Sequence, residues 1–273
     1  MNFERAGQAF EEYLNGYDRE NEKVKLKIIH TYGVVECARE IAKRMRLSRE
    51  DQDLAAIIGL LHDIGRFEQL KRFDSFQPDT MDHAAYGAEI LFGEERMIRR
   101  FVEDDRFDSI IETAIARHSS FELGEIPDGR TLLHARLIRD ADKLDNCRVK
   151  LEESLEVLLG VTEEEAGKGV ISPEVWTSCQ NRSSVLSADR VTPVDYWVSY
   201  IAQYYDVNFP ETFSIMKEEK YVPRIVERLH YTNPDTREKM YLLTEEMEEY
   251  MSEKINEVSD NVEKVSDKES GFQ

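Results

Sequence analysis

Helical periodicity is the feature that most restricts how this chain can fold. Apolar residues recur three and four positions apart through most segments, as Phe3, Ala6, Phe10 and Leu14 do, whereas runs that alternate with period two are scarce. With 273 residues and 41% hydrophobic content, the chain can bury a substantial core. We therefore expect an all-α fold.

Charge and cysteine content exclude several classes of protein. The chain carries 56 acidic and 36 basic residues, a net charge of -20, which repels nucleic-acid backbones and anionic membranes. No run approaches the roughly 20 apolar residues of a membrane span, and the N-terminus lacks a signal-peptide core. Cys37, Cys147 and Cys179 are far apart and odd in number, which favours reduced thiols. We expect a cytoplasmic protein without membrane binding or general nucleic-acid binding.

Several residues mark where helices begin and end. Ser48, with Asp51 three residues later, resembles a capping pair, and we expect Gly65 to close that helix in a left-handed conformation. Residues 66–81 have mixed charges and no clean period, so we expect a structured loop there. Asp82 can then cap the helix that follows it.

We divide the chain into three parts. Residues 1–160 form a helical domain, residues 161–250 a C-terminal helical extension packed on it, and residues 251–273 an acidic tail. The tail predicts either a partner-binding helix or an intramolecular or frayed helix, and whether the chain forms a homo-oligomer stays open. The apolar stripe is only about two heptads long, which is short for a stable helix pair, so the second interpretation is favoured. Its apolar residues have four-three spacing: Met251, Ile255, Val258, Val262 and Val265.

Four of the six histidines lie on predicted helices, His30, His62, His83 and His118. A single histidine on an apolar face is more often a hydrogen-bonded core residue than a ligand. Four on separate helices each need a partner for a desolvated imidazole, and a metal ion can serve all of them. His134 and His230 lack such companions, and we interpret both as structural.

Acidic residues accompany these histidines and complete a motif. The order of His30, the doublet His62-Asp63 and Asp142 resembles the H…HD…D signature of the HD-domain superfamily of metal-dependent phosphohydrolases. The resemblance covers roughly residues 22–150. It implies an HD-domain helical bundle, to which the residue patterns beyond it add C-terminal helices, and it implies that these four residues chelate one metal ion. Asp140 stays open as an alternative to Asp142.

The remaining two histidines extend the resemblance. His83 and His118 lie between the doublet and the last aspartate, as in HD proteins that hold two metals, where the doublet's aspartate bridges the ions. This implies that Asp63 is catalytic as a bridge and that His83 and His118 bind a second ion, although one ion with both histidines facing the pocket stays open. Imidazole and carboxylate ligands favour Mn²⁺ or Fe²⁺, with Co²⁺, Ni²⁺ or Zn²⁺ as alternatives.

Cations near the motif suggest how a phosphorylated substrate could bind. Arg66, Lys71 and Arg72 follow the doublet, and Lys143 follows Asp142. We expect these four residues to bind substrate phosphate and Arg66 and Lys143 also to act in catalysis. The expected partner is a small phosphorylated substrate, a nucleotide or another phosphoester. The alternatives are a diiron oxygenase of the same fold, or a regulatory HD domain without activity.

Overall fold

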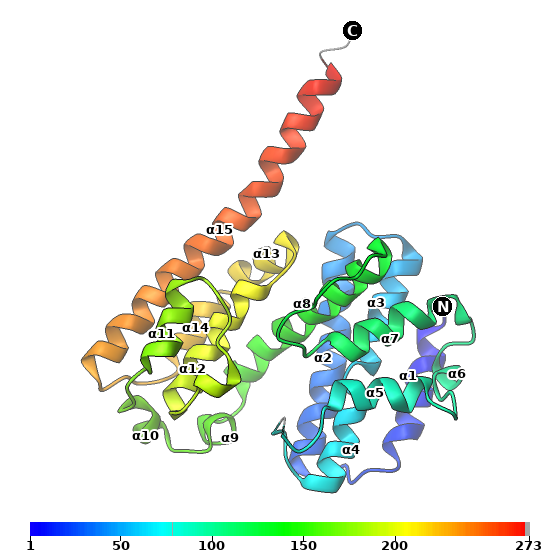
Figure 1. Cartoon of the computed structure of the whole chain (residues 1–273), viewed down its shortest axis with the longest axis horizontal. Helices are drawn as coiled ribbons and strands as arrows, with labels where there is room; N and C mark the ends of the chain where they lie inside the picture. The colour runs from blue at the N-terminus through cyan, green and yellow to red at the C-terminus, as the bar shows by residue number, and fades with distance from the viewer. Residues whose placement is uncertain (78, 271–273) are drawn as a thin grey trace. The chain divides into compact units, whose positions relative to one another are not determined.

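The computed structural model describes residues 1–77 and 79–270, although the side chains of residues 258–270 lie outside that description. The described residues form helices joined by turns and loops, with no strand among them, which confirms the all-α prediction (Figure 1). The chain divides into two compact units, Met1–Asp145 and Asn146–Gln273. None of the described helices is both long and apolar enough to cross a bilayer.

The first unit is a bundle in which α2 packs along α3, while α4 and α7 both pack against α5 (Figure 1). Helix α1 covers α3 and the short α6. Helix α8 begins in this unit and continues past the boundary at Asp145. The elements are α1 (Phe3–Leu14), α2 (Glu22–Arg44), α3 (Arg49–Leu61), α4 (Ile64–Phe73), α5 (His83–Phe92), α6 (Ile98–Phe101), η1 (Asp105–Phe107), α7 (Asp108–Arg117) and α8 (Gly129–Glu152).

Local capping explains where the helices around the motif begin. The Ser48 side chain accepts a hydrogen bond from the Asp51 amide at the start of α3, as predicted. The Asp82 carboxylate accepts from the Ala84 and Ala85 amides, so that α5 starts at His83. Capping therefore fixes the first residue of α5, which is one of the motif histidines.

The region after the doublet differs from the prediction. Gly65 does not close α3, which ends at Leu61, and residues 66–73 are not a loop but most of a new helix, α4. A Cβ on Gly65 would lie 2.2 Å from the His83 carbonyl oxygen, so this glycine allows close contact between α4 and α5. Phe67 is completely buried and anchors the helix. The left-handed cap is Asp74, with φ of 46°.

The second unit packs around aromatic and sulfur-containing side chains. Trp197 is completely buried, and its Nε1 donates a hydrogen bond to the Tyr231 hydroxyl at 3.0 Å. Helices α13 and α14 pack against α15. The elements are α9 (Leu155–Leu159), α10 (Glu163–Gly167), α11 (Pro173–Gln180), η2 (Ser187–Asp189), α12 (Pro193–Ala202), η3 (Gln203–Asp206), α13 (Pro210–Glu218), α14 (Tyr221–Glu227) and α15 (Pro234–Ser270).

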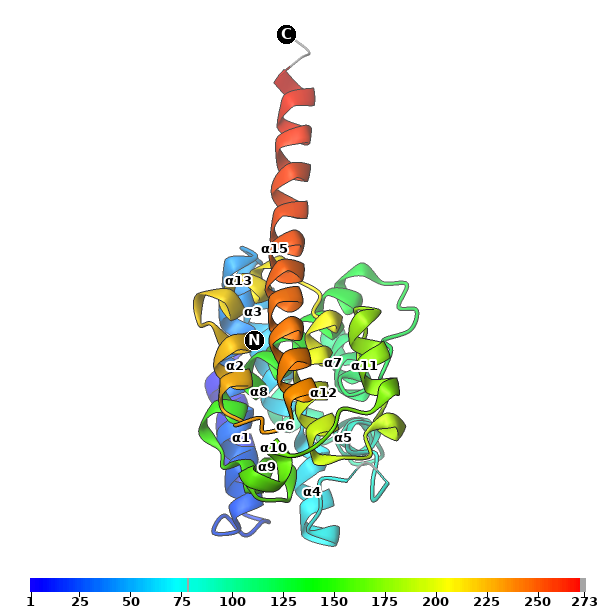
Figure 2. The same cartoon turned by 90° about the vertical axis from the view of Figure 1, so that its left-hand side faces the viewer.

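Helix α15 contains most of the predicted acidic tail. It runs past the other helices of its own unit toward the C-terminus (Figure 2). Met251, the first residue of the predicted apolar stripe, is completely buried, and Ile255 is partly buried. The valines of that stripe, Val258, Val262 and Val265, lie outside the residues whose side chains are described.

Candidate metal centre

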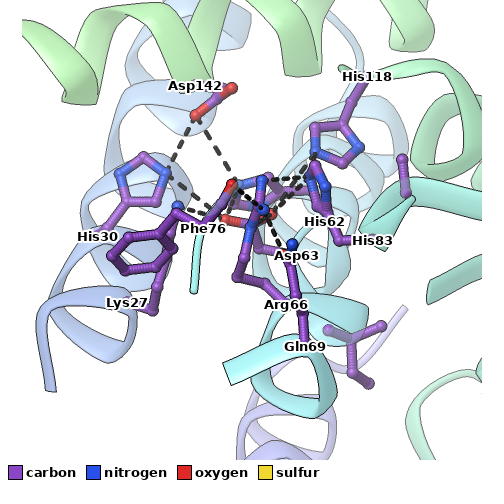
Figure 3. Close-up of polar contacts among 12 residues, drawn as sticks. Lys27, His30, His62, Asp63, Arg66, Gln69, Phe76, His83, His118 and Asp142 are labelled. Atoms are coloured by element: carbon purple, nitrogen blue, oxygen red, sulfur yellow. Dashed lines mark hydrogen bonds and ion pairs between the residues drawn. The ribbon is translucent and has the colours of Figure 1, made fainter. Parts of the chain in front are cut away.

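Helices α2, α3, α4, α5, α7 and α8 bring the motif residues together (Figure 3). His30 lies in the middle of α2. His62 and Asp63 form the junction between α3 and α4, His83 begins α5, and His118 follows directly after α7. Asp142 comes from α8. The structure therefore gathers into one cluster all the residues expected to bind metal: His30, His62, Asp63, His83, His118 and Asp142.

Glycines allow the helices to approach closely enough to form this cluster. A Cβ on Gly59 would lie 3.3 Å from the Cα of Val35, at the contact between α3 and α2. A Cβ on Gly33 would lie 2.0 Å from Asp145 Oδ1, so Gly33 makes room for that carboxylate on α8. Small residues at these two positions place His62 and His30 next to each other, with ring centroids 5.5 Å apart.

Hydrogen bonds on the outer side of three imidazoles set their tautomers. His62 Nδ1 lies 2.7 Å from the Gly59 carbonyl, and His118 Nδ1 lies 2.8 Å from the Ile115 carbonyl. A carbonyl oxygen only accepts, so in both rings Nδ1 carries the proton and Nε2 keeps its lone pair. His30 Nδ1 makes the equivalent contact with Asp145 Oδ2 at 2.7 Å. This is the arrangement in which an imidazole presents Nε2 to a metal ion.

The Nε2 atoms of His30 and His62 face two carboxylates. Asp63 Oδ2 lies 4.0 Å from His30 Nε2 and 3.6 Å from His62 Nε2. Asp142 Oδ1 lies 3.0 Å from His30 Nε2 and 4.0 Å from His62 Nε2. Among the described residues, both Nε2 atoms are buried without a hydrogen-bond partner, His30 Nε2 despite its 3.0 Å contact with Asp142 Oδ1. One cation between these atoms would satisfy all of them.

A second group of ligand atoms shares the same aspartate. Asp63 Oδ1 lies 3.2 Å from His83 Nε2 and 3.6 Å from His118 Nε2, and the two Nε2 atoms are 3.1 Å apart. Asp63 Oδ1 is buried without a hydrogen-bond partner among the described residues. Both groups, His30, His62 and Asp63, and Asp63, His83 and His118, are compact enough to hold a metal ion.

Burial and charge keep His62, His83 and Asp63 in the protonation states that metal binding needs, whereas His30 differs from them. Burial lowers the pKa of His62 and of His83 to about 4, so both imidazoles are neutral near pH 7. Burial alone would raise the pKa of Asp63, but the Lys27 ammonium and the neighbouring imidazoles hold it well below its usual value. For His30, burial and Lys27 oppose the charged form, yet contact with Asp142 and Asp145 raises its pKa. A proton on His30 would thus compete with a metal ion.

The predicted substrate-binding cations separate into different places. Arg66 reaches the cluster, with Nη2 2.9 Å from His83 Nε2 and Nε 3.8 Å from Asp63 Oδ1. Lys71 instead contacts the Gly16 carbonyl at 3.3 Å and the Tyr17 ring. The structure also turns Arg72 to other partners, Glu68 and the Tyr86 hydroxyl. Lys143 follows Asp142 on α8 and is partly exposed.

Lys27 and Asp145 also belong to the cluster, although the sequence motif does not include them. Lys27 Nζ donates a hydrogen bond to Asp63 Oδ2 at 2.7 Å. The signals were their positions, because Lys27 precedes His30 by three residues and Asp145 follows Asp142 by three, on the same helical faces. His134 lies outside the cluster, with Nε2 3.0 Å from Asp51 Oδ1, and His230 is exposed.

Comparison with known families agrees with this geometry. The family model described as "HD domain" matches residues 28–147, a range that contains the whole cluster except Lys27. No curated protein and no solved structure matches the chain significantly. Residues 28–147 are an HD domain, as the order of the motif residues predicted.

Proposed function

We propose that this HD-domain chain is a metal-dependent phosphohydrolase that acts on a nucleotide or another small phosphoester. One observation carries the proposal. The Nε2 atoms of four buried imidazoles surround the buried Asp63 carboxylate, and the Arg66 guanidinium lies beside them. The HD domain supports a hydrolase of this metal-dependent type. Mn²⁺ or Fe²⁺ is the best fit to imidazole and carboxylate ligands, with Co²⁺, Ni²⁺ or Zn²⁺ as alternatives.

We assign a first ion to His30, His62, Asp63 and Asp142, and a second ion to His83, His118 and the shared Asp63. The unpaired buried atoms support this assignment, because each unsatisfied polar atom costs about 1–3 kcal/mol. His30 Nε2, His62 Nε2 and Asp63 Oδ1 are three such atoms in one cluster. Metal ions would give each of them a partner.

The chemistry of bound ions and the exposure of Asp142 both support phosphoester hydrolysis at the cluster. Divalent ions held here would lower the pKa of a water molecule and stabilise charge on a phosphoryl oxygen. Asp142 is the cluster's most exposed ligand, with 26% of its side chain accessible against at most 9% for the other five. Substrate and water can therefore reach the cluster beside Asp142.

Arg66 is the residue best placed to bind the substrate's phosphate. Gln69 Oε1 and the Phe76 carbonyl accept hydrogen bonds from Arg66 Nη1, which fixes the guanidinium beside His83. A guanidinium fixed in this way presents its remaining N–H groups to phosphoryl oxygens. Lys71 and Arg72 contact other partners in this structure, and their roles in substrate binding stay predictions, as does the role of Lys143 beside Asp142.

Turnover of a panel of phosphoesters with Mn²⁺ or Fe²⁺ tests this function. We expect metal-dependent phosphate release by the wild type, loss of release in His62→Ala, and wild-type release in the control His230→Ala, whose histidine is exposed outside the cluster. Undiminished release by His62→Ala would contradict the proposal. Substrate oxidation that requires iron and O₂, and that Mn²⁺ does not support, would instead identify an oxygenase with the same ligands.

A further inference from the structure

The two oxygens of Asp63 divide the cluster into halves, and a side-chain cation stands at each half (Figure 3). Oδ2 faces His30 and His62, at 4.0 and 3.6 Å from their Nε2 atoms. Lys27 Nζ lies 2.7 Å from this oxygen. Oδ1 faces the other two imidazoles, and Arg66 Nε lies 3.8 Å from it. Lys27 thus occupies the same place in the first half that Arg66 occupies in the second.

The Lys27 ammonium can donate more hydrogen bonds than it makes to the described residues. It has three donors, and within the described part of the chain Asp63 Oδ2 is the one atom that accepts from it. The side chain is 17% exposed, so it is not sealed in the core. The Phe76 ring lies near both cations, with its centroid 5.8 Å from Lys27 Nζ and 6.0 Å from the guanidinium carbon of Arg66.

A metal ion in the first half would change the partner of Lys27. The ion would bind the same oxygen, Asp63 Oδ2, next to His30 and His62, and its charge would repel the ammonium. Lysine has a flexible stem of four carbons, so the ammonium can turn away without moving α2. It then needs another anion, and a partly exposed position beside the cluster makes a bound ligand available to it.

Building on the phosphohydrolase function, we propose that Lys27 is a substrate-binding residue that exchanges Asp63 Oδ2 for a phosphoryl oxygen in the metal-loaded protein. Arg66 binds the same group from the other half of the cluster. Two side-chain cations together with divalent ions carry more positive charge than a monoanionic diester balances. The subsite therefore fits the dianionic phosphoryl group of a phosphate monoester, and Lys27 is part of what selects it.

The alternative is that Lys27 serves only to neutralise Asp63. That role ends once metal ions bind the aspartate, so removing Lys27 would tighten metal binding and leave affinity for phosphate unchanged. The substrate-binding role makes the opposite prediction for phosphate. Metal content and phosphate affinity, measured separately, distinguish the two roles without any assay of activity.

Calorimetric titration of the Mn²⁺-loaded protein with inorganic phosphate and with dimethyl phosphate tests the proposal. We expect Lys27→Met to keep the wild-type Mn²⁺ content and to bind phosphate about tenfold to one-hundredfold more weakly, the loss of one charged hydrogen bond. Lys27→Arg should recover part of this affinity. Lys25→Met is the matched control, because Lys25 lies on the same helix and is exposed. The wild type should bind phosphate more tightly than dimethyl phosphate, and Lys27→Met should reduce that difference.

Wild-type phosphate affinity in Lys27→Met, an equal loss in Lys25→Met, or no preference of the wild type for phosphate over dimethyl phosphate would overturn the proposal. A wild type that holds Mn²⁺ and binds no phosphate would overturn it as well. The hydrolase function is tested apart from these results by wild-type turnover of phosphoesters. Normal turnover with unchanged phosphate affinity in Lys27→Met would reject only the role of Lys27.

Discussion

Replacing Asp145 by asparagine should weaken metal binding although Asp145 is not among the proposed ligands. Its Oδ2 accepts the hydrogen bond from His30 Nδ1 at 2.7 Å, and the pair is almost completely buried. An asparagine can still accept this hydrogen bond through its amide oxygen, but it removes the negative charge. The imidazole then becomes a weaker electron donor at Nε2, the atom that we propose binds the metal.

The size of the effect follows from the type of hydrogen bond. A buried hydrogen bond with a charged partner contributes about 1.5–3 kcal/mol, against about 1 kcal/mol for a neutral one. The difference is about 0.5–2 kcal/mol, and every 1.4 kcal/mol corresponds to about tenfold in affinity. The dissociation constant for the first Mn²⁺ should therefore rise roughly threefold to thirtyfold, with a larger rise in Asp145→Leu, which leaves His30 Nδ1 without an acceptor.

Titration calorimetry with Mn²⁺ at a series of increasing pH values measures this change, because a proton on His30, whose pKa is raised by its contacts with Asp142 and Asp145, competes with the metal ion. Asp51→Asn is the matched control, because Asp51 makes the same type of contact with His134 at 3.0 Å outside the cluster. Unchanged Mn²⁺ affinity in Asp145→Asn, or an equal loss in Asp51→Asn, would contradict a role of the Asp145 charge in metal binding.

Three further predictions concern the second ion, pH and packing. His118→Ala should lower the Mn²⁺ content from about two ions per chain to about one, because it removes a ligand from the second group only; elemental analysis that finds two ions would contradict the assignment. In the metal-free protein, the pKa of His62 and of His83 is lowered to about 4 by burial, whereas unfolded imidazoles titrate near about 6.5. Between these two pKa values the unfolded chain binds more protons than the folded chain, so the free energy of unfolding should fall by up to about 3 kcal/mol per histidine as the pH is lowered. Urea denaturation at several pH values measures this free energy, and a value that does not change with pH would contradict the prediction. Gly65→Ala should destabilise the protein by about 1–3 kcal/mol, because its Cβ would lie 2.2 Å from the His83 carbonyl oxygen. Gly7→Ala, where nothing lies within 4 Å of the new Cβ, is the control in thermal melts, and equal melting temperatures for the two variants would argue against this packing.

Much of the fold could be predicted because it depends on local signals. Helical spacing predicted the all-α architecture, and Ser48 and Asp82 marked two helix starts through their own capping hydrogen bonds. Helix α4 could not be predicted in this way. Gly65 looked like the end of a helix, but this glycine is needed for a close contact with the His83 backbone. Contacts between segments that are distant in the sequence leave no periodic pattern in it.

The histidines of the cluster could be predicted because the chain contains few histidines and these lie on apolar helix faces. Four histidines on separate helices were such a signal, whereas Lys27 and Asp145 are among 36 basic and 56 acidic residues. Lys71 and Arg72 were chosen because they are close to Arg66 in sequence. Since successive residues on a helix turn by about 100°, positions five and six residues later face away from Arg66.

We propose above that the cluster around Asp63 holds divalent metal ions. Anomalous X-ray diffraction from crystals grown with Mn²⁺ tests it most directly. We expect one peak in contact with His30, His62 and Asp142, and a second in contact with His83 and His118, with Asp63 in contact with both. Crystals that contain Mn²⁺ elsewhere, with no peak among these residues, would contradict the claim.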